Sequence, residues 1–201
     1  MNIQYLLRFY MKDDFEFSYK PVKKDLWDDM ETLFGPRGAC GGCWCMYWKL
    51  SPKKYNENKG IKNKTAQREI VSSGVVPGLI AYMNGVPVGW VAIESRDQYP
   101  RMENSRILKP IDDDEVWSIS CFFIEKNFRN QGISTKLLIA AVDYAASKGA
   151  RIVEGYPTDP GEKNMPAPFV YTGLAKAFLK AGFVEVERRS PTRPIMRYFI
   201  D

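Results

Sequence analysis

Hydrophobic residues recur along the chain with helical spacing in some stretches. In KKDLWDDMETLF, residues 23–34, they fall three or four positions apart, which predicts an amphipathic helix that ends at Gly35-Pro36. STKLLIAAVDYAASK, residues 134–148, has the same spacing and is followed by Gly149, a typical helix stop. Further helices are predicted from about 64 to 73 and from about 173 to 181.

Other stretches favour strands. The clearest is 77–95, two short apolar runs joined by Asn84-Gly85, a dipeptide that suits both central positions of a type I′ hairpin turn. VWSISCFFI, residues 116–124, is rich in aromatic and β-branched residues, which is typical of a central strand. The polar, proline-punctuated residues 97–115 predict a surface connection with one helical turn at most. The remaining predicted strands are 15–22, 150–156, 182–190 and 194–200.

The order is strand, helices, hairpin, strand, helix, strand, helix and two strands. Antiparallel pairing at both ends would therefore flank a central strand-helix-strand unit. We predict an α/β fold, α+β by a strict definition, in which residues 1–14 form an N-terminal extension and residues 15–201 a single domain.

Bulk composition narrows the function. The chain has 201 residues, 45% of them apolar, and a net charge of +5. No apolar run approaches the ~18 residues of a membrane span, and the N-terminus has no small-residue cleavage site, so we expect a cytoplasmic protein. The charge is too scattered to require a nucleic-acid partner, although it favours a phosphorylated anionic ligand. The chain has no histidine, so any catalysis must use carboxylates, tyrosine, cysteine, backbone amides or water.

The strongest functional pattern is CFFIEKNFRNQGISTKLL, residues 121–138. An apolar strand leads through a polar turn into a helix, and Gly132 would let a ligand approach the backbone closely. The first-turn amides of a helix have no internal partners and lie at its positive end, so they suit a diphosphate. The bland alternative is an ordinary helix start after a strand.

The whole stretch 122–138 resembles the central motif of the GNAT acyltransferases. That motif consists of a hydrophobic strand, a short turn, the pattern Arg/Gln-x-x-Gly-x-Gly/Ala and an amphipathic helix. Ser134 stands at the last motif position, where Gly or Ala is usual. The coarse element order agrees over residues 15–200. The resemblance implies a mixed, mostly antiparallel sheet in which the central strand has a bulge and splays from the parallel strand 150–156. It also implies acetyl-CoA as cosubstrate, held at the diphosphate by Arg129, Asn130, Gln131, Gly132, Ile133 and Ser134, and at the pantetheine arm by Phe122, Phe123 and Ile124.

The resemblance also implies a tyrosine that protonates the departing thiolate, shortly before a Gly-Phe pair. Here that pair is Gly182-Phe183, and Phe178 stands at the expected position. Tyr171 lies two helical turns earlier and could supply the hydroxyl, or it could simply pack at a helix start. As base we predict Glu154 at the end of the splayed strand. The alternatives are Glu115, Asp159 and a purely solvated Glu154.

Residues 38–49, GACGGCWCMYWK, hold three of the four cysteines. Zinc would need Cys121 as a fourth ligand, and a structural disulfide does not suit a reducing cytoplasm, so we predict no metal site. In the GNAT resemblance this stretch forms the acceptor side of the cleft. An aromatic wall there would suit an apolar or cationic substrate, and the other interpretation is that the tryptophans are core residues. The predicted substrate-binding residues are Cys43, Trp44, Cys45, Tyr47 and Trp48, with the tryptophans rather than the thiols touching substrate.

The sequence thus predicts an acetyl-CoA-dependent N-acetyltransferase that acetylates a small-molecule or peptide amine. The alternatives are a non-catalytic CoA-binding protein or cysteine-based redox or metal sensor on the same scaffold, and a zinc-stabilised interaction module. We expect a monomer or homodimer with no nucleic-acid or membrane partner.

Overall fold

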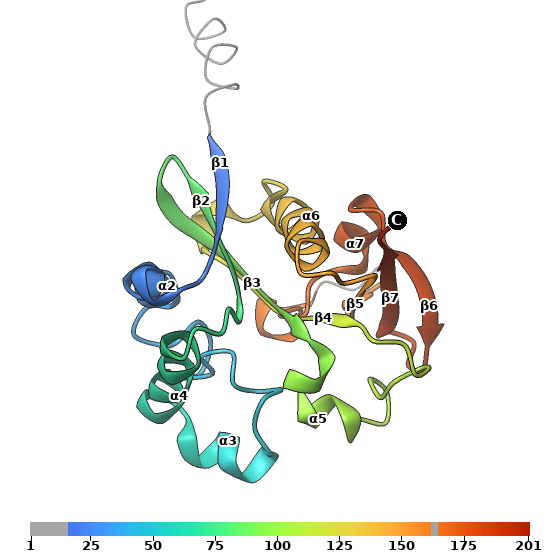
Figure 1. The fold of residues 1–201 in the computed structure, drawn as a ribbon, viewed down its shortest axis with the longest axis horizontal. Coiled ribbons are helices and arrows are strands. Elements are labelled where there is room, and N and C mark those ends of the chain that lie inside the picture. The colour runs from blue at the N-terminus through green and yellow to red at the C-terminus, as the bar shows by residue number, and fades with distance from the viewer. Residues whose placement is uncertain (1–15, 162–164) are drawn as a thin grey trace, which may run out of the picture.

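The computed structural model describes residues 16–161 and 165–201, so the predicted N-terminal extension lies outside the described residues. Seven strands form one sheet in the order β1-β2-β3-β4-β5-β7-β6 (Figure 1). All neighbouring pairs are antiparallel except the parallel pair β4 and β5. The mixed sheet of the sequence prediction is confirmed. The strands are β1 Phe17–Pro21, β2 Gly78–Met83, β3 Val86–Ser95, β4 Trp117–Ile124, β5 Ile152–Gly155, β6 Val184–Arg188 and β7 Pro194–Phe199.

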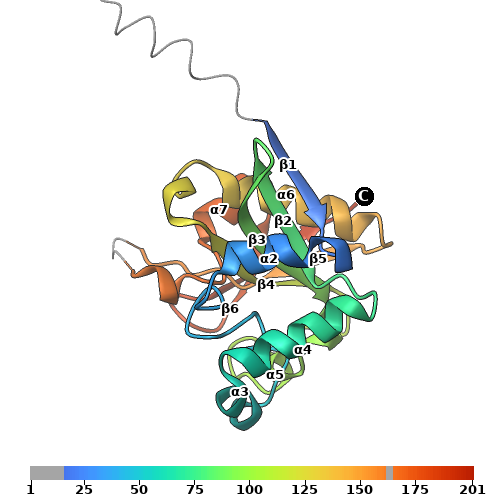
Figure 2. The ribbon, with the colours of Figure 1, turned by 90° about the vertical axis from the view of Figure 1, so that its left-hand side faces the viewer.

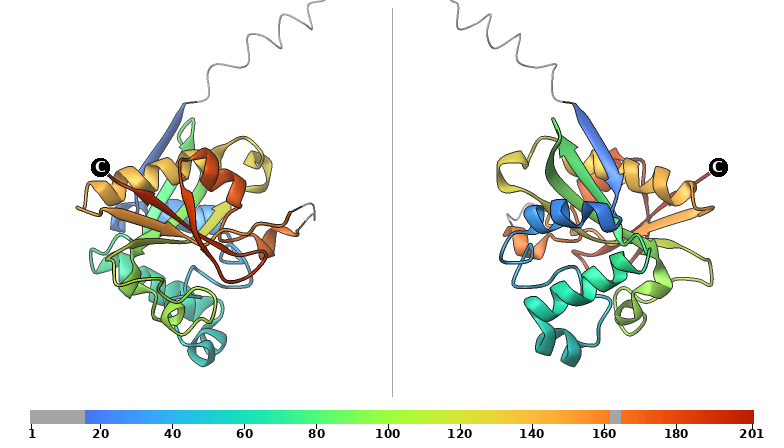
Figure 3. Two further views of the ribbon diagram at one scale, coloured as in Figure 1. Left: turned by 90° about the vertical axis from the view of Figure 1, so that its right-hand side faces the viewer. Right: turned by 60° about the vertical axis from the view of Figure 1, so that its left-hand side comes forward.

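Helices cover both faces of the sheet, with α2 and α4 on one side and α6 and α7 on the other (Figures 2 and 3). In the part of the chain that the structure describes, four short 3₁₀ turns occur at Lys24–Leu26, Arg96–Gln98, Lys126–Phe128 and Ala167–Phe169. Among the described residues, no helix is both long and apolar enough to traverse a bilayer. The α-helices are α2 Trp27–Phe34, α3 Pro52–Asn58, α4 Ile61–Ser72, α5 Pro100–Glu103, α6 Ile133–Ala146 and α7 Ala175–Lys180.

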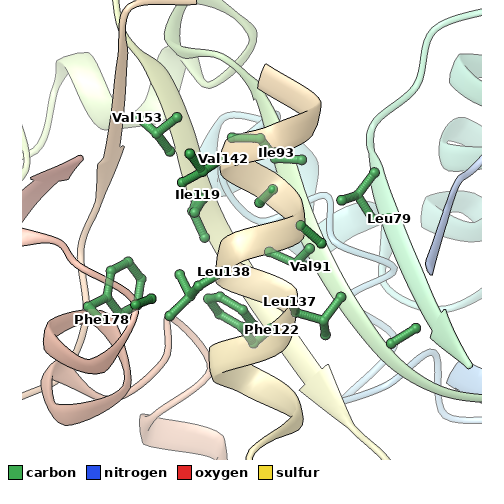
Figure 4. Packing of buried hydrophobic residues seen from close by; sticks show 14 of the residues in the cluster. Leu79, Val91, Ile93, Ile119, Phe122, Leu137, Leu138, Val142, Val153 and Phe178 are labelled. Atoms are coloured by element: carbon green, nitrogen blue, oxygen red, sulfur yellow. The ribbon is translucent and has the colours of Figure 1, made fainter. Parts of the chain in front are cut away.

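The alternation of side chains along the strands divides the core into two layers. Val91 and Ile93 pack under α6, whereas Trp90 and Ala92, which alternate with them along β3, pack against α2 and α4. The buried face of α6 presents Leu137, Leu138 and Val142 to the sheet, as Figure 4 shows. The Asn84-Gly85 turn has positive φ at both residues, which confirms the predicted hairpin.

The connection between β3 and β4 departs from the sequence prediction. It contains the helical turn α5, but it is not only a surface segment. Tyr99 and Met102 are completely buried and form a third apolar cluster with Tyr156 and Ile195. The prolines and charged residues of this segment concealed its apolar face. Helix α3 was also missed, because its sequence PKKYNEN carries almost no apolar period.

Candidate active site

Strands β4 and β5 pair over only the first part of β4, because β5 ends at Gly155, opposite Ile119. They pair in parallel only from Trp117 to Ile119. On the other side of β4, Ala92 is opposite Cys121 while Ile93 is opposite Ile119, so Ser120 is an extra residue in a β-bulge. Beyond the bulge, β4 and β5 no longer pair. The bulge and the splay expected from the family resemblance are therefore confirmed.

The loop before α7 bridges the gap at one point. The N–H of Phe122 donates a hydrogen bond to the carbonyl of Tyr171 at 2.6 Å. Two residues later, the carbonyl of Ile124 accepts a hydrogen bond from Nε of Arg129 at 3.0 Å. Two backbone groups at the separated end of β4 thus already have protein partners.

Helix α6 begins without a side-chain cap. Its N-cap residue is Gly132, with φ of +77°, and Asn130 also has positive φ, so the chain turns sharply into the helix. Nothing lies within 4 Å of the position that a Cβ on Gly132 would take. The first amides of the helix, at Ile133 and Ser134, are consequently open to a ligand. The geometry fits a diphosphate at the positive end of a 14-residue helix.

We call residues 129–134, at the start of α6, the cradle. A cavity of about 570 Å³ joins the cradle to the separated end of β4. It takes in every residue predicted to hold the cofactor except Gln131, whose side chain instead donates to the carbonyl of Asn127. All four cysteines of the chain contribute to its wall. The lining residues are Ala39, Cys40, Cys43, Cys45, Tyr47, Tyr55, Cys121, Phe122, Phe123, Ile124, Phe128, Arg129, Asn130, Gly132, Ile133, Ser134, Pro168, Val170, Tyr171, Gly173 and Leu174.

The cysteine loop, residues 38–49, owes its shape to positive φ angles. Trp44 and Cys45 both have positive φ, an unusual conformation for residues with a Cβ. This turn directs the Trp44 indole into the core, where it stacks on Trp27 with 6.0 Å between ring centroids. The thiol of Cys45 lies at the cavity wall, 3.5 Å from the sulfur of Cys121, and accepts a hydrogen bond from the Trp90 indole at 3.1 Å.

These positions correct the predicted acceptor wall. Trp44 and Trp48 do not line the cavity, whereas Cys43, Cys45 and Tyr47 do. Trp48 turns away and packs beside the cluster of Tyr99 and its neighbours. The string CWCMYW alone gives no way to tell which side chains face inward, because the two positive φ angles break the usual alternation of directions. Both tryptophans pack in apolar clusters, as the alternative interpretation expected, and which of these residues touch substrate stays a prediction.

Tyr171 lines the cavity, although for a different reason from the one predicted. Helix α7 begins only at Ala175, so Tyr171 belongs to the preceding loop and not to an earlier turn of the helix. Its ring contacts the ring of Tyr47, with 6.1 Å between centroids. Phe178 is fully buried and packs edge-on against Phe122 and Phe183.

Glu154 does not reach the cavity. Its carboxylate is buried and accepts hydrogen bonds from Arg96 at 3.0 Å, from Arg197 at 2.8 Å and from the Tyr156 hydroxyl at 2.7 Å. Two guanidinium groups thus neutralise it at the β5 to β7 junction. The side chain points to a polar cluster inside the fold, which contradicts the expectation that it faces the cleft. Neither of the alternatives, Glu115 and Asp159, lines the cavity.

Several ionisable groups in the cavity have raised pKa values. Burial raises the pKa of the Cys43 thiol to about 11. The neighbouring Cys121, together with burial, raises the pKa of the Cys45 thiol, and burial raises the pKa of the Tyr55 and Tyr171 hydroxyls. Neutral thiols are weak nucleophiles and weak metal ligands. Within residues 16–161 and 165–201, no three acidic or cysteine side chains form a group that could hold a metal ion.

Sequence reasoning missed Tyr55 and Cys40 as cavity residues. Tyr55 lies on α3, a helix that the pattern did not predict, and its ring packs edge-on against Tyr47 with 5.2 Å between centroids. The side-chain amide of Asn63 contacts the carbonyl of Gly42, and the amide of Gly60 donates to that same carbonyl, which joins the helical pair α3 and α4 to the cysteine loop. Contacts between segments that are distant in sequence therefore accompany the placement of Tyr55 at the cavity.

Comparison with known proteins gives the chain its family. Residues 43–171 match the model of the acetyltransferase (GNAT) family. An uncharacterised N-acetyltransferase from Methanocaldococcus jannaschii is similar, with 35% identity over 75 residues, which are 37% of this chain and only 29% of that protein.

Two solved structures share the fold. The paia N-acetyltransferase of Thermoplasma acidophilum in complex with coenzyme A aligns with a TM-score of 0.52 and 13% identity, over 92% of this chain and 99% of that chain. The aminoglycoside N-acetyltransferase AAC(6')-Iy in complex with CoA aligns with a TM-score of 0.53 and 18% identity, over 90% and 95%. The family model matches more than half of the chain, and the separated end of β4 and the uncapped start of α6 agree with it. The chain therefore belongs to the GNAT family of acetyltransferases, whose cosubstrate is acetyl-CoA.

Proposed function

We propose that this protein transfers an acetyl group from acetyl-CoA to the amine of a small molecule or peptide, by direct attack within a ternary complex. The observation that carries the proposal is the single cavity that joins the uncapped start of α6 to the separated end of β4. Relatives with this fold that were solved with CoA support the cosubstrate.

In this proposal, residues 129–134 hold the diphosphate of acetyl-CoA through backbone amides and the positive end of α6. Phe122, Phe123 and Ile124 face the pantetheine arm. Pairing with that arm requires the N–H of Phe122 to exchange its bond to Tyr171, or the arm to avoid this group. Acetyl-CoA supplies the thioester carbon that the amine attacks.

Tyr171 is the proposed acid. Tyr171 lines the cavity and its hydroxyl keeps its proton, because burial raises its pKa, so it can protonate the departing thiolate. Cys43, Cys45 and Tyr47 form the proposed acceptor side. Glu154 is left to an internal ion-pair role, because both of its oxygens are engaged by arginines away from the cavity. We therefore assign no carboxylate base.

A charge placed in the cradle tests the proposal. In Ser134→Asp the carboxylate would stabilise the first turn of α6 while repelling a diphosphate at the same amides. We expect acetyl-CoA affinity to fall by about 10- to 100-fold, the effect of about 1–3 kcal/mol of lost charge-assisted contact, with the thermal midpoint preserved. Titration calorimetry measures the affinity.

Ser147→Asp, just past the other end of α6, makes the same charge change as a control and should leave the affinity unchanged. Tyr171→Phe should lower kcat about 10²-fold and leave acetyl-CoA affinity intact. Undiminished binding in Ser134→Asp, or failure of the native protein to bind acetyl-CoA, would contradict the proposed function.

A second candidate is a thiol-based sensor on the same scaffold, favoured by the 3.5 Å separation of the Cys45 and Cys121 sulfurs. Both thiols are free. Oxidation would remove two protons and two electrons to form the disulfide, and would reduce one hydrogen peroxide to two waters. The raised pKa of the Cys45 thiol makes this reaction slow at neutral pH. Binding of acetyl-CoA without turnover, together with peroxide-dependent loss of both thiols by mass spectrometry, would favour the sensor.

Three broader expectations remain part of the proposal. One seven-stranded sheet supports a single domain over residues 15–201. Four free thiols are consistent with a cytoplasmic location, where thiols stay reduced. We also propose that the protein is a monomer or a homodimer. Its molar mass, measured by light scattering in solution, distinguishes the two states.

A further inference from the structure

The acceptor side of the cavity has no carboxylate or imidazole among its described lining residues. The chain has no histidine, and none of the lining residues is Asp or Glu. The raised pKa of the Cys43 and Cys45 thiols and of the Tyr55 and Tyr171 hydroxyls keeps these groups protonated at neutral pH. The titratable and charged groups that face the cavity are Cys40, Cys43, Cys45, Tyr47, Tyr55, Cys121, Arg129 and Tyr171.

Two of the aromatic rings that could hold a cationic substrate already hold cations of the protein. The guanidinium of Arg101 lies 3.8 Å from the ring centroid of Tyr47 and donates to its hydroxyl at 3.0 Å. The ammonium of Lys59 lies 5.4 Å from the ring centroid of Tyr55. A second cation on either ring would meet a reduced negative quadrupole and a like charge behind it.

One further buried carboxylate lies near the wall without joining it. Glu94, on β3, is 4% exposed and forms an ion pair with Lys49, and the Tyr99 hydroxyl donates to it at 3.4 Å. Both of these contacts engage Oε2, while the buried Oε1 has no hydrogen-bond partner among the described residues and burial raises the pKa of this carboxyl. Glu94 is nevertheless not among the residues that line the acceptor space.

We propose that the acceptor is an aromatic amine of the aniline class, which is already neutral at physiological pH, and not an alkyl amine or polyamine. The inference rests on the proposed acetyl transfer and narrows its substrate class. Three tyrosine rings, the thiols and Pro168, Val170 and Leu174 give the flat, apolar surroundings that an aromatic ring prefers.

A neutral aromatic amine can attack the thioester without first losing a proton to a base. The amine nitrogen attacks the thioester carbon, a carbon–nitrogen bond forms and the carbon–sulfur bond breaks. The nitrogen loses one proton and the departing sulfur gains one, through the Tyr171 hydroxyl or solvent. An alkyl ammonium must first lose an additional proton, for which the described cavity residues provide no carboxylate or imidazole.

Two isomeric amines of equal size test the inference directly, 4-methylaniline and benzylamine. We expect kcat/KM for 4-methylaniline to exceed that for benzylamine by at least about tenfold at pH 7, and to stay flat between pH 6 and 8.5. For benzylamine it should rise about tenfold per pH unit, since only the neutral amine reacts. Release of the CoA thiol measures the rate.

A variant supplies what the cavity lacks. Cys43→Asp introduces a carboxylate at the wall and should raise kcat/KM for benzylamine about tenfold at pH 7, relative to the neutral, isosteric control Cys43→Asn. If both variants unfold, which a thermal scan reveals, the pH profile of the native protein still decides.

The outcomes separate the two proposals. Benzylamine or 1,4-diaminobutane acetylated at pH 7 as fast as 4-methylaniline would overturn the aromatic-amine inference while leaving acetyl transfer standing. Binding of acetyl-CoA with no transfer to 4-methylaniline would overturn the aromatic-amine inference alone, whereas failure to bind acetyl-CoA would overturn the proposed function and this inference with it.

Discussion

The two halves of the cavity are built in opposite ways. The cradle, residues 129–134, uses exposed backbone amides at an uncapped helix start, with open space around Gly132. The cysteine loop, residues 38–49, uses side chains that are fixed by buried packing, and a methyl group on Gly38 would overlap the Trp44 indole. Both regions depend on positive φ angles, but only the loop is crowded.

This difference explains which half could be predicted. A backbone cradle needs only a strand, a turn with glycine and a helix, and each leaves a sequence pattern. The direction of a loop side chain depends on local dihedral angles and on distant partners, which a single sequence does not reveal. A ligand can approach the cradle without displacing core residues, because the space around Gly132 is open. A substitution in the cysteine loop can displace the buried Trp44 and so disturb the core.

The largest expected effect is on the crowded side. Gly38→Ala would force a residue with a Cβ into φ of +57° and drive its methyl group into the Trp44 indole. We expect the free energy of unfolding to fall by about 3–5 kcal/mol, from left-handed strain and overpacking together. Urea denaturation measures the loss. Gly41→Ala in the same loop has the same φ of +57° and open surroundings, so a loss as large there would contradict the role of the indole.

The sequence predicted much of the fold and a part of the site. The hairpin at Asn84-Gly85, the central strand and α6 followed from period and turn chemistry. Tyr171 lines the cavity as the sequence predicted, but the prediction placed it on an earlier turn of the helix, whereas it lies in the loop before α7. The inward turn of Glu154 could not be foreseen, because its partner Arg197 is 43 residues away in sequence and meets it only across the sheet.

A second test concerns the buried thiol of the loop. The pKa of Cys43 is about 11 in the folded protein against 9.0 in the reference state, so both states are protonated below pH 9. Between pH 9 and 11 the unfolded chain loses this proton first, and folding stability should fall by about 2–3 kcal/mol through this group. Cys43→Ala should remove that part of the decline.

The measurement is the difference in unfolding free energy between the native protein and Cys43→Ala, followed from pH 8 to 11. Other groups with raised pKa, such as the Cys45 thiol, contribute in both proteins and cancel. The exposed thiol of Cys40 in the same loop gives the control variant Cys40→Ala. A difference that does not change with pH would mean that Cys43 is not shielded from solvent.

The smallest expected effect on stability lies in the cradle, where it separates strain from ligand contact. Gly132→Ala and Gly149→Ala stand at the two ends of α6, with φ of +77° and +83° and nothing near the added methyl group. Each should cost about 1 kcal/mol of stability, since each forces alanine into the left-handed region. Only Gly132→Ala should also weaken acetyl-CoA binding, by about tenfold, because its methyl group covers the amides that the diphosphate approaches. Equal acetyl-CoA affinities for the two variants would mean that the ligand does not depend on close approach to this backbone, and the contrast between an open cradle and a crowded loop would lose its functional meaning.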